Sequence, residues 1–381
     1  MSLFYKRTVA PQGYYQSLEA FRGIAALSVV VHHLGIVNGH QLAFFKGAGI
    51  VVDFFFLLSG FVMAHAYNGR IVRGLGFWTY LRARLARLYP LHLFLLLFWV
   101  PYILVKIWVY QKINIGMDPA EANNVASFVA NLLLLHSMGI FDLLSWNYPS
   151  WSISVEFWTY IVFFFAVRYA YKMLSQVMFG ISLICAFALA YLAQSEPGTH
   201  GILYTYDYGF LRCLMSFGGG VVLNALHNRV EIVAPLWLQS LIEVVLICAC
   251  FVAIVLSVQG PIWQFAAIGI FGVTIFWFAD SAGLMSSVLK TSPMRFLGVV
   301  SYSVYMTHAI IVAMVENVFR YIIKLPVVAP EFAGSGRPPL DTPWAGLIAL
   351  GTVILVLAVS ALTYRYIEVP GKSLGRARRK G

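Results

Sequence analysis

The 381-residue sequence is 60% hydrophobic and 16% aromatic, only 11% of its residues are charged, and its mean hydropathy is +0.80. Soluble globular domains contain about 25% charged residues, so this composition excludes a soluble protein and predicts a chain that crosses a membrane several times. The formal net charge of +11 is distributed in short clusters between apolar runs, which indicates membrane topology and anionic lipid rather than nucleic acid. The four cysteines have no CxxC spacing, so we expect neither a disulfide framework nor a metal site.

Successive apolar runs have about the length that a helix needs to cross the hydrocarbon layer. We place ten predicted spans at 18–38, 50–67, 90–110, 149–171, 176–194, 209–226, 238–258, 261–279, 297–319 and 344–366. A further apolar piece at 128–141 leaves two alternatives open: a re-entrant or interfacial helix, or an additional crossing that would invert the later topology. We therefore expect an all-α polytopic membrane protein with a single transmembrane domain over 1–381 and no appended soluble domain.

The basic residues predict the orientation, because Lys and Arg near span ends are retained in the cytoplasm. The predicted inside segments hold Lys6 and Arg7, the arginines between residues 70 and 87, and the tail KSLGRARRK, whereas the outside segment 195–209 has no basic residue. Both termini are thus expected to be cytoplasmic. No apolar stretch with a small-residue cleavage site precedes the first span, which we expect to act as an uncleaved signal.

The first span, in the sequence SLEAFRGIAALSVVVHHL, contains four polar residues whose burial in the membrane costs free energy. They are Glu19, Arg22, His32 and His33. Arg22 and His33 are eleven residues apart, which puts them on nearly the same helical face about 16 Å apart along the axis. Arginine binds phosphate through its planar fork and histidine exchanges a proton near neutral pH. The face therefore predicts an anion site at the cytoplasmic end and a titratable group nearer the outer surface.

A second basic cluster precedes the third predicted span, in the sequence RARLARLYPLH. Arg84 and Arg87 are spaced to share a helical face, and together with Arg22 they would form a pocket for a polyphosphate. We interpret Arg82 as ordinary topogenic charge.

Two acidic residues lie near the predicted outer side, Asp53 in VVDFFFLLSGFVM and Glu156 in NYPSWSISVEFWTY. The antiparallel direction of the spans would bring Glu156 to the depth of His33, where a carboxylate orients an imidazole. A structural Glu bonded to the neighbouring Ser152 or to a tyrosine is the alternative. Trp151 belongs to a group of external aromatic residues that could stack on a sugar ring.

The ninth predicted span contains Ser301, Tyr305 and His308 on one face in SYSVYMTHAII. A hydrogen-bonded helix contact explains Ser301. We keep His308 and Tyr305, with Trp151 and Ser152, as candidate substrate-binding residues. FGGGVVL at 217–223 is expected to allow close helix packing.

These motifs occur together in one known family. LEAFRGIAALSVVVHHL with its Arg-x10-His spacing, DFFFLLSGFVM, RLARLYPLH, PSWSISVEFWTY and SYSVYMTHAII, in this order across about residues 17–310, resemble acyltransferase family three. Its members are integral-membrane enzymes that O-acylate sugars and other hydroxyl acceptors. Many relatives carry a C-terminal extracytoplasmic hydrolase-like domain, which we do not expect in this chain.

The resemblance implies that acyl-CoA docks from the cytoplasm and that its acyl group, most commonly acetyl, passes to a hydroxyl on the outer side. By this resemblance Arg22 and His33 fill the Arg-x10-His motif, while Arg84 and Arg87 fill the Arg-x-x-Arg motif. The expected acceptor is a polysaccharide or oligosaccharide, and the expected location is a bacterial inner membrane. A homo-oligomer is compatible with the sequence.

Our hypothesis for the chemistry makes His33 the general base, with Glu156 or Asp53 holding its tautomer, and leaves a covalent acyl-histidine intermediate open. Acceptors other than a glycan stay open as well: a lipid-linked precursor, peptidoglycan or a secreted small molecule. From another class, a proton-coupled anion transporter would also use intramembrane Arg, His and Glu, although we find no repeated halves. A non-catalytic scaffold or sensor would have little use for these charges.

Overall fold

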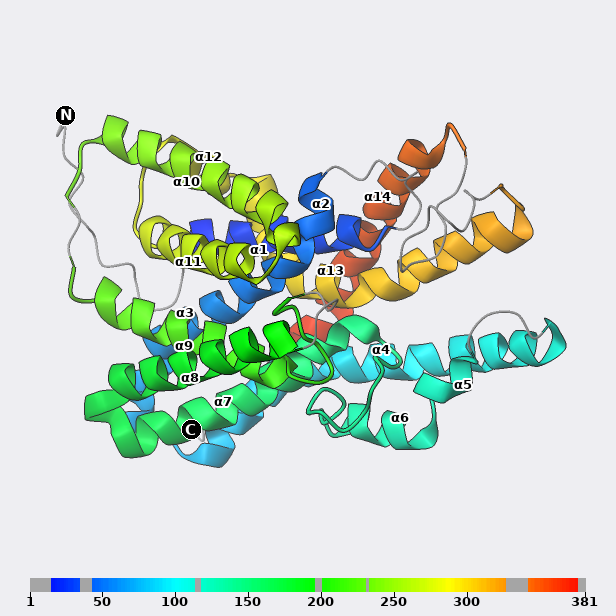
Figure 1. The fold of residues 1–381 in the computed structure, drawn as a ribbon, viewed down its shortest axis with the longest axis horizontal. Coiled ribbons are helices and arrows are strands. Elements are labelled where there is room, and N and C mark those ends of the chain that lie inside the picture. The colour runs from blue at the N-terminus through cyan, green and yellow to red at the C-terminus, as the bar shows by residue number, and fades with distance from the viewer. Residues whose placement is uncertain are drawn as a thin grey trace.

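The computed structural model describes residues 15–34, 43–113, 118–195, 201–230, 233–326 and 342–375. In these ranges the regular elements are helical, as the sequence predicts (Figure 1). They are α1 Gln16–His32, α2 Ala43–Gly47, α3 Val51–Val72, α4 Phe77–Ile113, α5 Pro119–Ala122, α6 Val125–Leu132, α7 Trp151–Ala170, α8 Leu174–Ser195, α9 Gly209–His227, α10 Leu236–Leu256, α11 Pro261–Phe278, α12 Leu284–Leu289, α13 Ser292–Asn317, α14 Ala345–Thr363 and α15 Val369–Leu374. Two π-helical segments, Val318–Ile322 and Tyr364–Glu368, follow α13 and α14.

Within the described residues, eight helical segments are long and apolar enough to cross a membrane. One of them, Tyr148–Ser195, contains both α7 and α8, which are joined by the 3-10 turn Tyr171–Met173. The 17 residues of α1 are at the lower end of the length that spans hydrocarbon. The protein is thus a multi-pass membrane protein. The count of ten spans stays a prediction, as does the cytoplasmic placement of the termini, since Lys6, Arg7 and most of the C-terminal basic tail lie outside the described residues.

The apolar piece at 128–141 does not form a crossing. Its helix α6 has eight residues, about 12 Å, and is followed by irregular backbone. Side chains of α7 supply hydrogen bonds to this irregular backbone. Ser154 Oγ and Trp158 Nε1 both donate to the carbonyl of Leu134, at 2.7 and 2.8 Å. Such backbone is tolerated at membrane depth only where protein groups satisfy it.

Helices α1 and α13 run parallel and in close contact. A Cβ on Gly23 would lie 2.6 Å from the backbone carbon of Leu297, so glycine is required for this approach. Ten residues after Gly23 and eleven after Leu297, His33 contacts His308. Successive spans alternate in direction, so two parallel spans are separated by an odd number of crossings, as the predicted first and ninth spans are.

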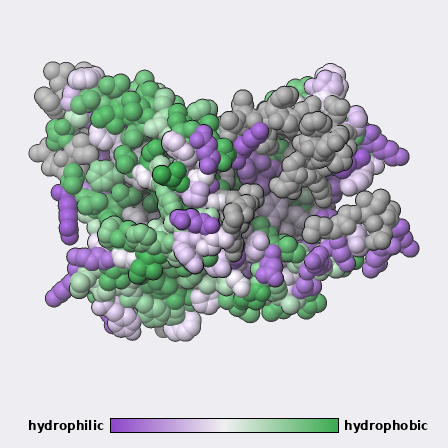
Figure 2. All heavy atoms as spheres, viewed as in Figure 1, coloured by the Kyte–Doolittle hydropathy of each residue, from purple (hydrophilic) through white to green (hydrophobic). Residues whose placement is uncertain are grey.

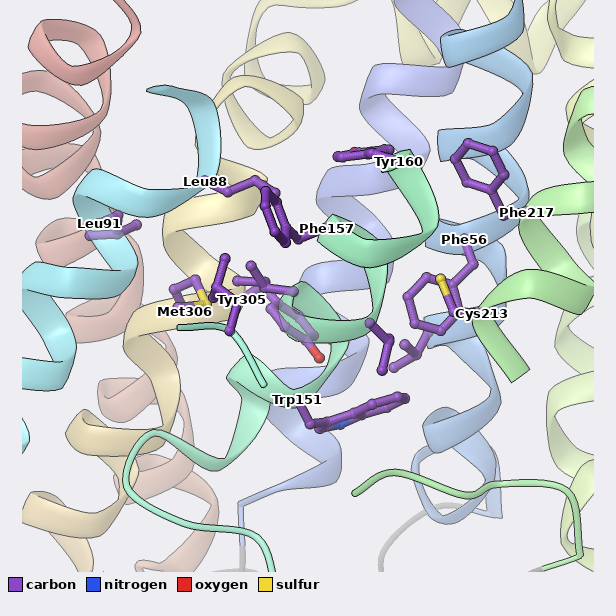
Figure 3. Close-up of a cluster of buried hydrophobic side chains, with 14 of the residues drawn as sticks. Phe56, Leu88, Leu91, Trp151, Phe157, Tyr160, Cys213, Phe217, Tyr305 and Met306 are labelled. Atoms are coloured by element: carbon purple, nitrogen blue, oxygen red, sulfur yellow. The ribbon is translucent and has the colours of Figure 1, made fainter. Parts of the chain in front are cut away.

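Helices α3 and α9 pack just as closely, with Gly60 against the carbonyl of Phe217 and Gly220 against the carbonyl of Leu57. This contact explains the glycines of FGGGVVL as the sequence predicts. The buried cluster around it includes Phe56, Trp151 and Phe217 (Figure 3).

The outer surface carries many exposed apolar side chains, as expected for lipid contact. On α8, Ile184 is 70% exposed and Phe187 is 73% exposed. In Figure 2 hydrophobic residues dominate the left half and the lower edge of the molecule, while hydrophilic residues gather towards the right end of the long axis.

Candidate active site

Two adjoining cavities enter the helix bundle where α1, α3, α4 and α13 meet. The larger has a volume of about 550 Å³ and the smaller, deeper one about 90 Å³. Their walls share six residues, Arg22, Leu58, Val62, Arg87, Ser301 and Tyr302. We call the larger cavity the vestibule and the smaller one the inner chamber. The vestibule and the inner chamber therefore adjoin at these residues.

The vestibule gathers the three arginines that the sequence singles out, Arg22 from α1 and Arg84 and Arg87 from α4. Arg84 donates to the hydroxyl of Tyr67 and lies 4.6 Å from the centre of its ring. In the part of the chain that the structure describes, Arg22 and Arg87 make neither a hydrogen bond nor an ion pair. Two guanidinium groups at a cavity wall thus keep their donors for an anionic ligand.

The C-terminal helices add two vestibule residues that the sequence analysis missed. Lys372 donates to Glu368 Oε2 at 2.9 Å, and Glu368 Oε1 accepts from Ser303 Oγ at 2.5 Å. The π-helical segment Tyr364–Glu368 turns both Tyr364 and Glu368 towards the cavity. The sequence contained a signal for Glu368, because it is the only acidic side chain between residues 342 and 381 and it follows closely on a predicted span.

Glu156 lies in the inner chamber and does not contact His33, whereas the sequence analysis expected its carboxylate to orient that imidazole. Its Oε1 accepts hydrogen bonds from Ser59 Oγ at 2.5 Å and from Tyr160 OH at 2.6 Å. The tyrosine alternative considered from the sequence is therefore the one observed. The carboxylate lines the same chamber as Arg22 and Arg87, so its charge faces the two unpaired guanidinium groups.

Asp53 is not beside His33 either. It is fully buried against α9, where it accepts from Arg212 Nη2 at 2.6 Å, from Arg212 Nε at 2.9 Å and from Ser216 Oγ at 2.8 Å. The close α3–α9 packing turns Asp53 towards this arginine, and Trp151 packs on the guanidinium with 5.3 Å from ring centre to Cζ. Asp53 and Trp151 line neither cavity, and both are buried in the bundle core.

The sequence analysis did not single out Arg212, although a lone arginine in a predicted span signals an intramembrane partner.

The Asp53–Arg212 pair should hold α3 and α9 together. Asp53→Asn leaves a buried guanidinium without its counter-charge, which costs about 3–5 kcal/mol, so we expect a clearly lower unfolding temperature in detergent. Replacing both partners, Asp53→Asn with Arg212→Met, should recover much of that loss because no charge is left buried. A single variant as stable as the wild type would contradict this role.

His33 and His308 form a pair at the far end of α1 and α13. His33 Nδ1 lies 3.0 Å from the Val29 carbonyl oxygen and 3.2 Å from His308 Nε2, and His308 Nδ1 lies 2.6 Å from the Tyr305 carbonyl oxygen. A carbonyl only accepts, so in the neutral pair both Nδ1 atoms carry the hydrogen. His33 Nε2 then has a free lone pair, and His308 takes the orienting position that the sequence analysis gave to a carboxylate.

Tyr305 separates the inner chamber from this histidine pair. Its hydroxyl accepts from Ser152 Oγ at 3.0 Å, and both residues line the chamber. On the other side its ring centre lies 5.9 Å from that of His308. The rings of His33 and Tyr148 lie 5.1 Å apart. One aromatic ring thus stands between the chamber and the histidines.

The geometry defines a class of protein: a multi-pass membrane protein with an arginine-rich cavity and, one helical turn beyond the cavity residue Tyr305, a contact between His33 and the buried His308. A family model described as an acyltransferase domain, that of acyltransferase family three, matches residues 15–364. The chain belongs to this family.

Curated relatives agree with the family and cover the chain to different extents. The peptidoglycan O-acetyltransferase OatA of Listeria monocytogenes is 23% identical over 95% of this chain. The acyltransferase MdmB of Streptomyces mycarofaciens is 30% identical over 39% of the chain, and protein 2 in the picA locus of Rhizobium radiobacter is 42% identical over 22%. These matches span 56%, 38% and 44% of the relatives' own lengths. No solved structure matches the chain significantly.

Proposed function

We propose that this protein transfers an acyl group, acetyl first of all, from acyl-CoA to a hydroxyl group of an extracytoplasmic acceptor. The observation that carries the proposal is the pair of adjoining cavities, whose shared wall contains Arg22 and Arg87, two arginines that make no hydrogen bond or ion pair with the described residues. The phosphates of CoA would bind these guanidinium groups, with Arg84 and Lys372 at the vestibule wall. The pantetheine arm then directs the thioester into the inner chamber.

In the reaction, the acceptor oxygen attacks the thioester carbonyl carbon, the carbon–sulfur bond breaks and CoA leaves as its thiolate. His33 Nε2 takes the proton of the acceptor hydroxyl and returns it to the thiolate, so the products are the ester and CoA thiol. His308 supports this role because its Nε2 accepts from His33 Nδ1 in both protonation states of His33. For the acceptor to meet the thioester, the Tyr305 ring must move aside, since it stands between them.

The acceptor is an exported glycan in this proposal. The name of the Listeria relative points to peptidoglycan as one such glycan, whereas lipid-linked precursors and secreted small molecules are the other acceptors to test. The proposal places the protein in the bacterial inner membrane, with its arginines at the cytoplasmic side, in keeping with the positive-inside distribution of Lys and Arg.

The test uses purified wild type in nanodiscs with acetyl-CoA labelled in the acetyl group. Release of CoA thiol and formation of a base-labile labelled ester are followed with an envelope-glycan fraction, a lipid fraction or buffer alone. We expect ester in one acceptor fraction and thiol release in equal amount. Absence of both acyl-CoA binding and thiol release would overturn the proposal and would favour an anion transporter.

A further inference from the structure

The inner chamber has a defined size and an apolar wall. It measures about 90 Å³, and its wall includes Val52, Phe55 and Phe56 of α3. Its polar lining residues are Arg22, Ser59, Arg87, Ser152, Glu156, Ser301, Tyr302 and Tyr305. An acyl group that enters the chamber from the vestibule would lie against this apolar wall.

The volume of the chamber limits the group that fits. An apolar protein cavity of about 150 Å³ binds benzene, which has six non-hydrogen atoms. The same ratio gives roughly four non-hydrogen atoms for a chamber of about 90 Å³. This is enough for an acetyl or a propionyl group but not for a butyryl or a succinyl group.

The wall is too well packed to give way easily. The Phe55 ring meets the Tyr305 ring edge to face at 5.8 Å, and Phe56 is buried against Trp151 at 5.9 Å. The backbone of α3 is fixed on α9 by the Gly60 and Gly220 contacts. Close-packed interiors respond to an added methylene with strain rather than with expansion.

We propose that the inner chamber selects the donor by acyl length, admitting two- and three-carbon groups, and that Phe55 is the side chain that sets this limit. The inference rests on the proposed function and adds a specificity-determining residue to it. Phe55 is chosen because it lines the chamber and its ring packs edge to face on that of Tyr305, another lining residue.

The choice of donor separates the effect of the size of the acyl group from the effect of its charge. A succinyl group carries a carboxylate, which would be repelled by Glu156 and attracted by Arg22 and Arg87, whereas a butyryl group is neutral. Rejection of both four-carbon donors indicates size. Rejection of succinyl alone indicates charge and contradicts the proposal.

The experiment compares acetyl-, propionyl-, butyryl- and succinyl-CoA as donors for the wild type, Phe55→Leu, Phe55→Ala and Phe54→Ala in nanodiscs. Phe54 is the matched control, because it is a buried phenylalanine of the same helix that packs on Phe21 and Phe271 and does not line the chamber. The quantity measured is the butyryl-to-acetyl ratio of kcat/KM within each variant, which cancels any loss of folded protein.

For the wild type we expect butyryl to be about tenfold to two-hundredfold poorer than acetyl, since butyryl exceeds the limit by one methylene and one methylene is worth about that much. The ratio should rise by about tenfold in Phe55→Leu and further in Phe55→Ala, with no rise in Phe54→Ala. Equal use of acetyl and butyryl by the wild type, or the same rise of the ratio in the Phe54 and Phe55 variants, would overturn this inference. Either result would leave the proposed function intact. A wild type inactive with all four donors would remove the proposed function itself.

Discussion

His33→Gln is expected to abolish acyl transfer while acetyl-CoA still binds. The substitution removes the free Nε2 lone pair that takes the acceptor proton, and loss of a general base typically costs about a hundredfold to ten-thousandfold in turnover. Acetyl-CoA binding should change by less than about twofold, because His33 lines neither cavity. Thiol release and equilibrium binding are measured on the same nanodisc preparation.

The adjacent His32 provides the control. Its Nδ1 lies 2.6 Å from the Phe45 carbonyl oxygen, away from His308, so His32→Gln should retain turnover. His308→Gln tests the positioning role separately, since it should lower kcat and displace the pH profile without changing the KM for acetyl-CoA. Full activity in His33→Gln, or loss of donor binding in that variant, would contradict the assignment.

Arg87→Gln is expected to weaken acetyl-CoA binding by about tenfold to a hundredfold. One or two charge-assisted hydrogen bonds to phosphate, worth about 1.5–3 kcal/mol each, would be lost, and about 1.4 kcal/mol corresponds to a factor of ten. Acetyl-pantetheine lacks the phosphates, so its weaker binding should be unchanged by the substitution. Binding of both donors is measured by titration in nanodiscs.

Arg82 is the matched control for this effect. It lies on the same helix and is exposed, its Nε donates to the Leu374 carbonyl at 3.1 Å, and it does not line the vestibule. Arg82→Gln should therefore bind acetyl-CoA as the wild type does. If Arg82→Gln and Arg87→Gln weaken binding equally, general surface charge rather than a built phosphate site is responsible.

The arrangement divides the proposed reaction between two places. The arginines and Glu156 surround the cavity, whereas the histidine pair lies beyond Tyr305. In the proposed reaction the donor and the acceptor lie on opposite sides of the membrane, and a Tyr305 ring between them would shield a bound thioester from water. Opening at Tyr305 would then accompany acceptor binding.

Local sequence determined the membrane class and the arginine cluster. Apolar runs of spanning length can only be helices or barrels in lipid, and their composition favoured helices. Arg84 and Arg87 share a face because residues three apart in a helix are neighbours, and their meeting with Arg22 agrees with the positive-inside rule, which predicts that all three lie at the same side of the membrane. These conclusions needed only helical periodicity and the distribution of charge along the chain.

Only the tertiary structure decided which polar groups meet. Asp53 and Glu156 were both assigned to His33 from depth alone, but depth does not fix the rotation of a helix about its axis. The glycine contacts of α3 with α9 and of α1 with α13 set that rotation, so that Asp53 meets Arg212, Glu156 meets Ser59, and His33 meets His308. The chamber volume is likewise a product of side chains from several helices, and no single segment of the sequence contains it.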